Sequence, residues 1–196
     1  MFNPPEEKSY SYLDQLLALG LSKDVALKVI AIFNSFSEMN KLLKEVEDDI
    51  WKYWNSGFWI VIPTNGSVKK NNAAVMGKGL ALQAKMKFPR LSFELARRLK
   101  IYGNCVFVFT DFRIITFPVK KRWQDKASLE LIEKSCKELL EIFKYNLSGI
   151  PTPIYIPKVG CGNGKLNWKN VKPILEKHLD SRFIICDLCD FKMESE

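Results

Sequence analysis

The sequence predicts a three-layer α/β fold, in which helices cover both faces of a mixed central sheet, preceded by a small helical extension. Short apolar runs rich in β-branched and aromatic residues alternate with helical segments from about residue 41 onward. Residues 11–40 carry apolar residues at helical spacing alone. We therefore assign 1–40 to the extension and 41–196 to the α/β domain.

The extension is expected to form two helices around the break Gly20-Leu21-Ser22. The Ser22 hydroxyl can cap the second helix by accepting a hydrogen bond from a backbone N–H group. The stretch from Leu19 to Ala26 resembles the first turn of ubiquitin-associated domains and, less closely, that of helix-hairpin-helix DNA-binding units. A DNA-binding turn needs a glycine where Ser22 stands, and residues 1–40 carry a net charge of −2, so a packing role is favoured.

The elements of the α/β domain follow from its apolar runs and their spacing. Two neighbouring runs around Thr110-Asp111 predict a hairpin, and Pro89 is expected to end the helix that begins after Gly77 and Gly79. The remaining helices are predicted at 91–99, 128–145 and about 170–179, and the strands at 59–63, 105–109, 113–117, 154–157 and 183–186.

The composition is that of a folded, soluble protein, because 47% of the 196 residues are hydrophobic and 27% are charged. The net charge of +8 favours an anionic partner and leaves a nucleotide, a nucleic acid or an acidic lipid open. Residues 69–100 hold nine basic residues against the single acid Glu94, so the positive charge is densest there. No apolar run is long enough to span a membrane and no signal peptide is apparent, so we expect a cytoplasmic protein without membrane contact.

The five cysteines are an odd number, so a disulfide framework is not expected. Cys186 and Cys189 have the spacing of a metal or redox pair. A structural zinc site needs four ligands, however, and His178 is the only histidine of the chain. The pair is therefore interpreted as unliganded, and no metal site is predicted.

Two glycine loops are the candidate binding elements. Val75–Leu80 opens a helix, and Val159–Gly164 follows a strand. Glycines at such places let backbone N–H groups approach an anion closely, so two loops fit the two phosphates of a diphosphate. Lys165 is not followed by Ser or Thr and neither loop has G-x-G-x-x-G spacing, which excludes a P-loop and a dinucleotide fingerprint. On spacing alone, two ordinary strand-to-helix turns explain the loops equally well.

Five further segments follow one another along the chain: Asp49–Trp51, Ile62–Gly66, Val75–Lys85 with Phe88-Pro89, Phe117–Lys120, and Gly160–Gly164 with Trp168, Val171 and Pro173 behind it. Together and in this order they resemble the macro domain, a family that binds ADP-ribose. Within that family the sequence is most similar to the branch that contains the DNA ADP-ribosyl glycohydrolase antitoxins and the terminal ADP-ribose protein glycohydrolase. The resemblance implies ADP-ribose as the ligand, with no cofactor required.

The resemblance also implies the roles of the residues that would bind ADP-ribose. Asp49 would accept from the adenine amino group and the Ile50 N–H would contact the ring edge, although a carboxylate here is also a common helix cap. Asn65 would contact the distal ribose and take part in catalysis, or else serve only as a turn residue before Gly66. The remaining residues implied to bind the ligand are Thr64, Met76, Gly77, Lys78, Gly79, Gly160, Cys161 as a filler, Gly162, Asn163 and Gly164.

Lys120 is the residue on which the resemblance places the chemistry. In related glycohydrolases a lysine at this place acts on the distal ribose, in some as a nucleophile that attacks C1″. An amine attacks only when it is neutral, so its pKa must be lowered by burial or by nearby positive charge, for which Lys121 and Arg122 are the candidates. The alternative is that all three are surface cations on a loop.

The implied function is removal of ADP-ribose from nucleic acid or protein. The protein glycohydrolase has an acid where this chain has Gly164, and the DNA-directed enzymes lack it, which favours nucleic acid as the target. Trp123, which follows Lys120, Lys121 and Arg122, is placed to stack on a target nucleotide. A cognate ADP-ribosyltransferase would then supply the modification. The alternatives are a non-catalytic ADP-ribose reader and an ADP-ribose-1″-phosphatase.

Overall fold

The computed structural model describes residues 11–41, 43–145 and 150–187. The chain divides into two compact units, Met1–Lys41 and Leu42–Glu196. No helix of the described residues is long and apolar enough to cross a membrane.

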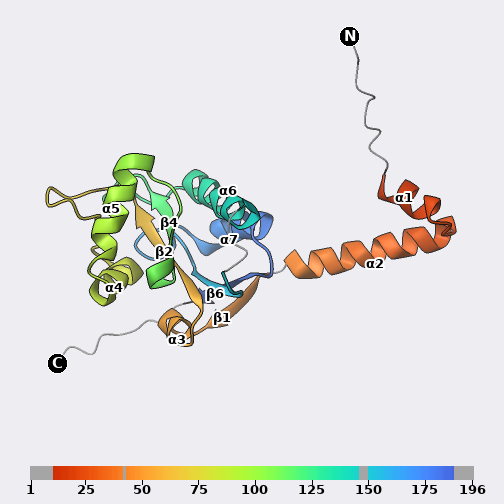
Figure 1. The fold of residues 1–196 in the computed structure, drawn as a ribbon, viewed down its shortest axis with the longest axis horizontal. Helices are drawn as coiled ribbons and strands as arrows, with labels where there is room; N and C mark the ends of the chain where they lie inside the picture. The colour runs from red at the N-terminus through yellow and green to blue at the C-terminus, as the bar shows by residue number, and fades with distance from the viewer. Residues whose placement is uncertain (1–10, 42, 146–149, 188–196) are drawn as a thin grey trace, which may run out of the picture. The chain divides into compact units, whose positions relative to one another are not determined.

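The first unit contains two helices, α1 (Tyr12–Ala18) and α2 (Lys23–Lys41), separated at Gly20 (Figure 1). Gly20 has a φ of +85°, and the N–H groups of Gly20 and Leu21 close the end of α1 by donating to carbonyls of its last turn. The Ser22 hydroxyl accepts from Val25 N at 3.4 Å, as expected for a capping residue. The resemblance of this unit to ubiquitin-associated domains stays a prediction.

The second unit is built on one mixed six-stranded sheet with the strand order β1-β6-β5-β2-β4-β3. All neighbouring strands run parallel except β3 and β4, which form the predicted antiparallel hairpin. The mixed sheet flanked by helices confirms the predicted fold class. The strands are β1 (Lys44–Glu47), β2 (Trp59–Asn65), β3 (Phe107–Phe109), β4 (Ile114–Lys120), β5 (Ile154–Pro157) and β6 (Phe183–Asp187).

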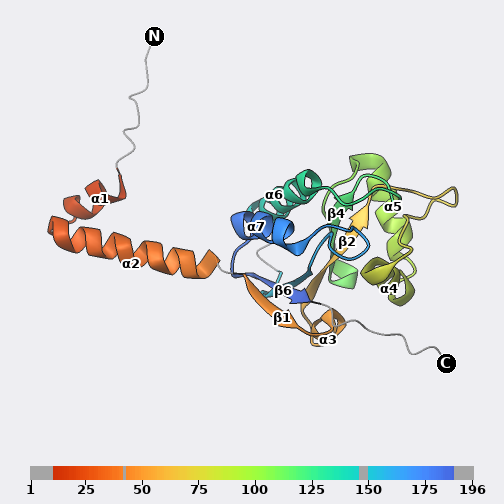
Figure 2. The ribbon, with the colours of Figure 1, turned by 180° about the vertical axis from the view of Figure 1, so that it is seen from behind.

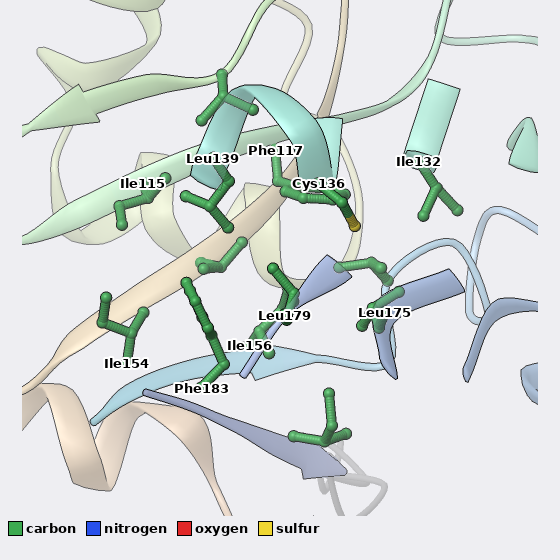
Figure 3. Close-up of a cluster of buried hydrophobic side chains, with 14 of the residues drawn as sticks. Ile115, Phe117, Ile132, Cys136, Leu139, Ile154, Ile156, Leu175, Leu179 and Phe183 are labelled. Atoms are coloured by element: carbon green, nitrogen blue, oxygen red, sulfur yellow. The ribbon is translucent and has the colours of Figure 1, made fainter. Parts of the chain in front are cut away.

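Helices cover both faces of this sheet (Figures 1 and 2). One face carries α4 (Gly79–Lys87) and α5 (Leu91–Tyr102), with α3 (Ile50–Asn55) nearby, and the other carries α6 (Leu129–Tyr145) and α7 (Trp168–His178). Successive residues of a strand point to opposite faces, so Ile60 and Ile62 of β2 pack beneath α4 and α5 while Val61 packs beneath α6 and α7. Figure 3 shows the second of these two cores, where Phe117 and Phe183 are fully buried.

Two elements, β1 and α3, were not predicted from the sequence. β1 carries only one apolar residue, Val46, because it is an edge strand that pairs with β6 alone. α3 has only six residues, and it begins where the Asp49 carboxylate accepts from Trp51 N at 2.9 Å.

Four cysteines lie within the described residues, and all four are free thiols: Cys105, Cys136, Cys161 and Cys186. Cys189, the second member of the predicted unliganded pair, lies outside the described residues. Within the described part of the chain, no three potential metal-ligating side chains lie together.

Candidate active site

The end of the central strands brings Asn65 and Lys120 together. They are the last residues of β2 and β4, which run parallel, and they are partners in the register of the two strands. Ligands of open α/β sheets bind at this carboxyl edge. Thr64, one residue earlier, is 5% exposed, so its side chain belongs to the core.

The Asn65 amide organises the loop that follows β2. Its Nδ2 donates to the carbonyl of Val75 at 2.9 Å, and its Oδ1 accepts from the Ser67 N–H at 3.0 Å. Asn65 therefore does act as a turn residue. An amide carries two donor hydrogens and two acceptor lone pairs, so each end of the group retains capacity for one further partner.

Lys120 connects β4 to the second glycine loop. Its Nζ donates to the carbonyl of Asn163 at 2.7 Å. Burial lowers the pKa of the Lys120 ammonium, and the positive charges of Lys165 and Lys78 lower that pKa further, against the opposing charge of Asp125. Lys78 lies in the first glycine loop and Lys165 directly follows the second, so both loop regions favour the neutral, nucleophilic form of the amine.

The expected source of this repulsion needs correction. The sequence pointed to Lys121 and Arg122, which follow Lys120 directly, but the cations that lower its pKa are Lys165 and Lys78. Arg122 is paired with Asp125, with 3.0 Å between its guanidinium and the carboxylate. Arg122 is not among the groups that shift the pKa of Lys120.

The first glycine loop contacts the second. Gly79 begins α4 with a φ of +54°, and a Cβ there would lie 3.0 Å from Nδ2 of Asn163. Gly77 has open space where its Cβ would be, as a backbone that faces a ligand requires. Met76 differs from its neighbours because its side chain is 1% exposed and packs in the core.

The second glycine loop is closely packed at both ends and open in the middle. Gly160 has a φ of +77°, and a Cβ on Gly164 would lie 2.2 Å from the carbonyl oxygen of Gly160. Gly162 has nothing within 4 Å of its Cβ position. Burial raises the pKa of the half-buried Cys161 thiol, which suits a filler and not a nucleophile.

The start of α3 holds the residues expected at the adenine. The cap on Trp51 N uses one carboxylate oxygen of Asp49, and within the described residues the other accepts no hydrogen bond. Ile50, the first residue of α3, is fully buried and packs in the core. The indole of Trp51 donates to Gln83 of α4 at 2.8 Å, which ties this region to the helix that follows the first glycine loop.

Asn104 supports the site, although no sequence pattern pointed to it. Asn104 Nδ2 donates to the backbone carbonyl of Lys120 at 2.9 Å, and its Cγ would lie 3.1 Å from a Cβ on Gly66. Asn104 precedes a predicted strand and resembles any loop residue. Lys165 could have been found from the sequence, since it directly follows the second glycine loop.

Comparison with known proteins identifies relatives over about half of the chain, although no family model matches it. The chain is 31% identical over 121 residues to the DNA ADP-ribosyl glycohydrolase of Thermus aquaticus, a match of 57% of this chain and 32% of the relative. It is 35% identical over 104 residues to the ADP-ribose glycohydrolase OARD1 of Bos taurus, which covers 52% of this chain and 65% of the relative. A fusion of a DNA ADP-ribosyl transferase and a DNA ADP-ribosyl glycohydrolase from Thermosipho africanus is 27% identical over 137 residues, 58% of this chain and 34% of the relative.

Solved structures that are similar to this chain come from the same group of proteins as these relatives. The macrodomain of Mycobacterium tuberculosis DarG superimposes with a TM-score of 0.58 at 24% identity, over 74% of this chain and 97% of that structure. Thermosipho africanus DarTG in complex with ADP-ribose gives a TM-score of 0.54 at 21% identity, over 70% of this chain and 39% of that structure. The chain therefore has the fold of these structures, but it spans only about a third of the length of its curated bacterial relatives.

Proposed function

We propose, from the premise that this chain is a macro domain related to the DNA ADP-ribosyl glycohydrolases and to OARD1, that it removes ADP-ribose from a nucleic-acid base or a protein side chain. The relatives carry that activity in their names, and a solved relative contains ADP-ribose. The absence of an acid at Gly164 favours nucleic acid as the carrier.

The ligand positions in this proposal follow the carboxyl edge of the sheet. Asp49 and the Ile50 N–H bind the adenine at the start of α3, where one carboxylate oxygen is unengaged. The diphosphate lies between the two glycine loops, whose open glycines, Gly77 and Gly162, expose the backbone. The distal ribose then lies over Asn65 and Lys120, which stand side by side at the strand ends.

The observation that carries the proposal is the position of the Lys120 amine between the two loops with a lowered pKa. The neutral amine attacks C1″ of the distal ribose, the bond from C1″ to the base or side chain breaks, and the leaving group takes up a proton. Water then hydrolyses the adduct and releases ADP-ribose and the free amine. An amine below its ordinary pKa is more often neutral near pH 7, which this step requires.

The test uses two substrates, ADP-ribosylated single-stranded DNA and a protein that carries ADP-ribose on glutamate. We expect wild-type protein to release ADP-ribose from at least one of them and Lys120→Ala to release none, while calorimetry shows that both still bind free ADP-ribose. Lys44→Ala removes an exposed lysine at the start of the edge strand β1 and serves as the control, with wild-type turnover. Full turnover in Lys120→Ala would refute the mechanism.

Other outcomes separate the alternatives. If wild-type protein binds ADP-ribose but cleaves neither substrate, the chain is a reader, and phosphate release from ADP-ribose-1″-phosphate would identify a phosphatase. We further propose a cognate ADP-ribosyltransferase as the partner that supplies the modification. The Thermosipho africanus relative, in which both activities share one polypeptide, supports this pairing.

A further inference from the structure

We infer that Trp123 and the turn that carries it form a platform on which a base of single-stranded nucleic acid stacks beside Lys120. The inference deepens the proposed function by naming a contact to the carrier outside the ADP-ribose site. It rests on the proposed function, in which nucleic acid carries the ADP-ribose, but the DNA binding that it predicts is measured without any turnover.

The turn that presents Trp123 is fixed at both ends. The Asp125 N–H donates to the carbonyl of Arg122 at 3.1 Å, which makes Trp123 and Gln124 the central residues of a tight turn. The Asp125 carboxylate also accepts from the Arg122 N–H at 2.9 Å and from its guanidinium. Exposed turns seldom carry tryptophan centrally, because glycine, proline and small polar residues suit those positions better.

The Trp123 side chain is nevertheless 54% exposed. Its backbone N–H donates to the Ser67 hydroxyl at 3.0 Å, and the Ser67 N–H donates in turn to Asn65. This chain of hydrogen bonds holds the turn against the loop that leaves β2. A large aromatic surface on a fixed turn loses little conformational entropy when a partner covers it.

The position of Trp123 matches the geometry of a tethered base. It follows Lys120 by three residues, so the two Cα atoms are separated by at most about 11 Å. In the proposed reaction the carrier is bonded to C1″, the atom that Lys120 attacks. The modified base or its neighbour on the strand therefore lies within reach of the indole.

The charge around the turn suits a phosphate backbone. Lys121 and Lys126 flank it and are exposed, and the loop held by Ser67 carries the exposed Lys69 and Lys70. The acid of the turn, Asp125, is paired with Arg122. Proteins that bind single-stranded nucleic acid without reading its sequence combine cations along the phosphate backbone with aromatic side chains on which the bases stack. A peptide carrier would use the cations but has no base to stack.

The test measures binding of unmodified, fluorescein-labelled single-stranded DNA of about ten nucleotides by anisotropy. We expect Trp123→Ala to weaken this binding by about 5- to 100-fold, and Trp123→Phe to retain most of it. Free ADP-ribose should bind all variants equally. Phe93→Ala is the matched control, because Phe93 is 53% exposed in the same basic protein but lies on α5.

Two results would overturn the inference. One is that Trp123→Ala binds DNA with an affinity within twofold of wild type, or loses no more affinity than Phe93→Ala does. The other is an equal loss of cleavage of ADP-ribosylated DNA and protein in Trp123→Ala, which would make the turn a general docking element. Failure of the proposed function leaves the anisotropy result intact, so the two can fail separately. Unchanged thermal unfolding of Trp123→Ala verifies that the variant is folded.

Discussion

Replacement of Gly164 by alanine tests whether packing alone fixes the second glycine loop. The added Cβ would lie 2.2 Å from the Gly160 carbonyl oxygen and 2.8 Å from Cβ of Ala127. Both neighbours are held in place, since Gly160 O accepts from Leu166 N at 3.0 Å and Gly164 O accepts from Ala127 N at 3.0 Å. The loop must therefore move and weaken both hydrogen bonds.

The cost follows from these contacts. Each hydrogen bond contributes about 0.5–1.5 kcal/mol, and overpacking adds about 1–3 kcal/mol, so we expect a loss of roughly 2–6 kcal/mol in the free energy of unfolding. For a protein of this size, that loss lowers Tm by roughly 5–20 °C. Gly164→Asp should cost at least as much, which means that this chain cannot accommodate the acid of the protein glycohydrolase without rebuilding the loop.

Urea unfolding followed by tryptophan fluorescence measures this loss. Gly162→Ala is the control within the same loop, because nothing lies within 4 Å of its Cβ position, and its stability should stay within about 1 kcal/mol of wild type. Equal unfolding midpoints for Gly164→Ala and Gly162→Ala would refute the packing argument.

Two further predictions concern pH. Lys165→Met removes a positive charge that lowers the pKa of Lys120, so the acidic limb of the pH profile of kcat/KM should move to higher pH. Asp125→Asn removes the opposing negative charge and should move this limb to lower pH. Identical pH profiles for wild type and both variants would contradict the electrostatic argument. Glu133 accepts from His178 and two lysines, which lowers its pKa from 4.5 to about 2, so the stability that it contributes is complete above pH 4.5 and is lost as the pH falls toward 2. Urea midpoints between these pH values should therefore fall more steeply for wild type than for Glu133→Gln, and parallel curves would count against this pairing.

The sequence was most informative where one physical requirement dominates a segment. The run Trp59–Pro63 is apolar throughout because β2 lies at the centre of the sheet and is covered on both faces. The helix after Gly79 ends at Lys87, before Pro89, as the steric effect of proline requires. β1 has no such pattern, because three of the four residues of this edge strand are exposed and need not be apolar.

The candidate site was predictable as a set of segments but not as a set of contacts. Glycines mark the loops at 77–79 and 160–164, yet only the packing shows which of them need glycine for space and which leave backbone open. Neighbours in sequence suggested Arg122 as the cation near Lys120, but its pairing with Asp125 depends on the turn. The support that Asn104 gives to the Lys120 carbonyl comes from a residue remote in sequence.

The cations near Lys120 serve two purposes that oppose each other once a ligand binds. In the free protein Lys78 and Lys165 lower the pKa of Lys120, and in the proposed complex they attract the diphosphate. A bound diphosphate would cancel part of their repulsion and so raise the pKa of the amine. Burial makes the largest contribution to the lowered pKa in the free protein, and it increases when ligand covers the site, so it keeps lowering the pKa in the complex. The proposed nucleophile therefore depends on burial to stay neutral in the complex, because the hydrogen bond from its Nζ to the Asn163 carbonyl favours the charged form.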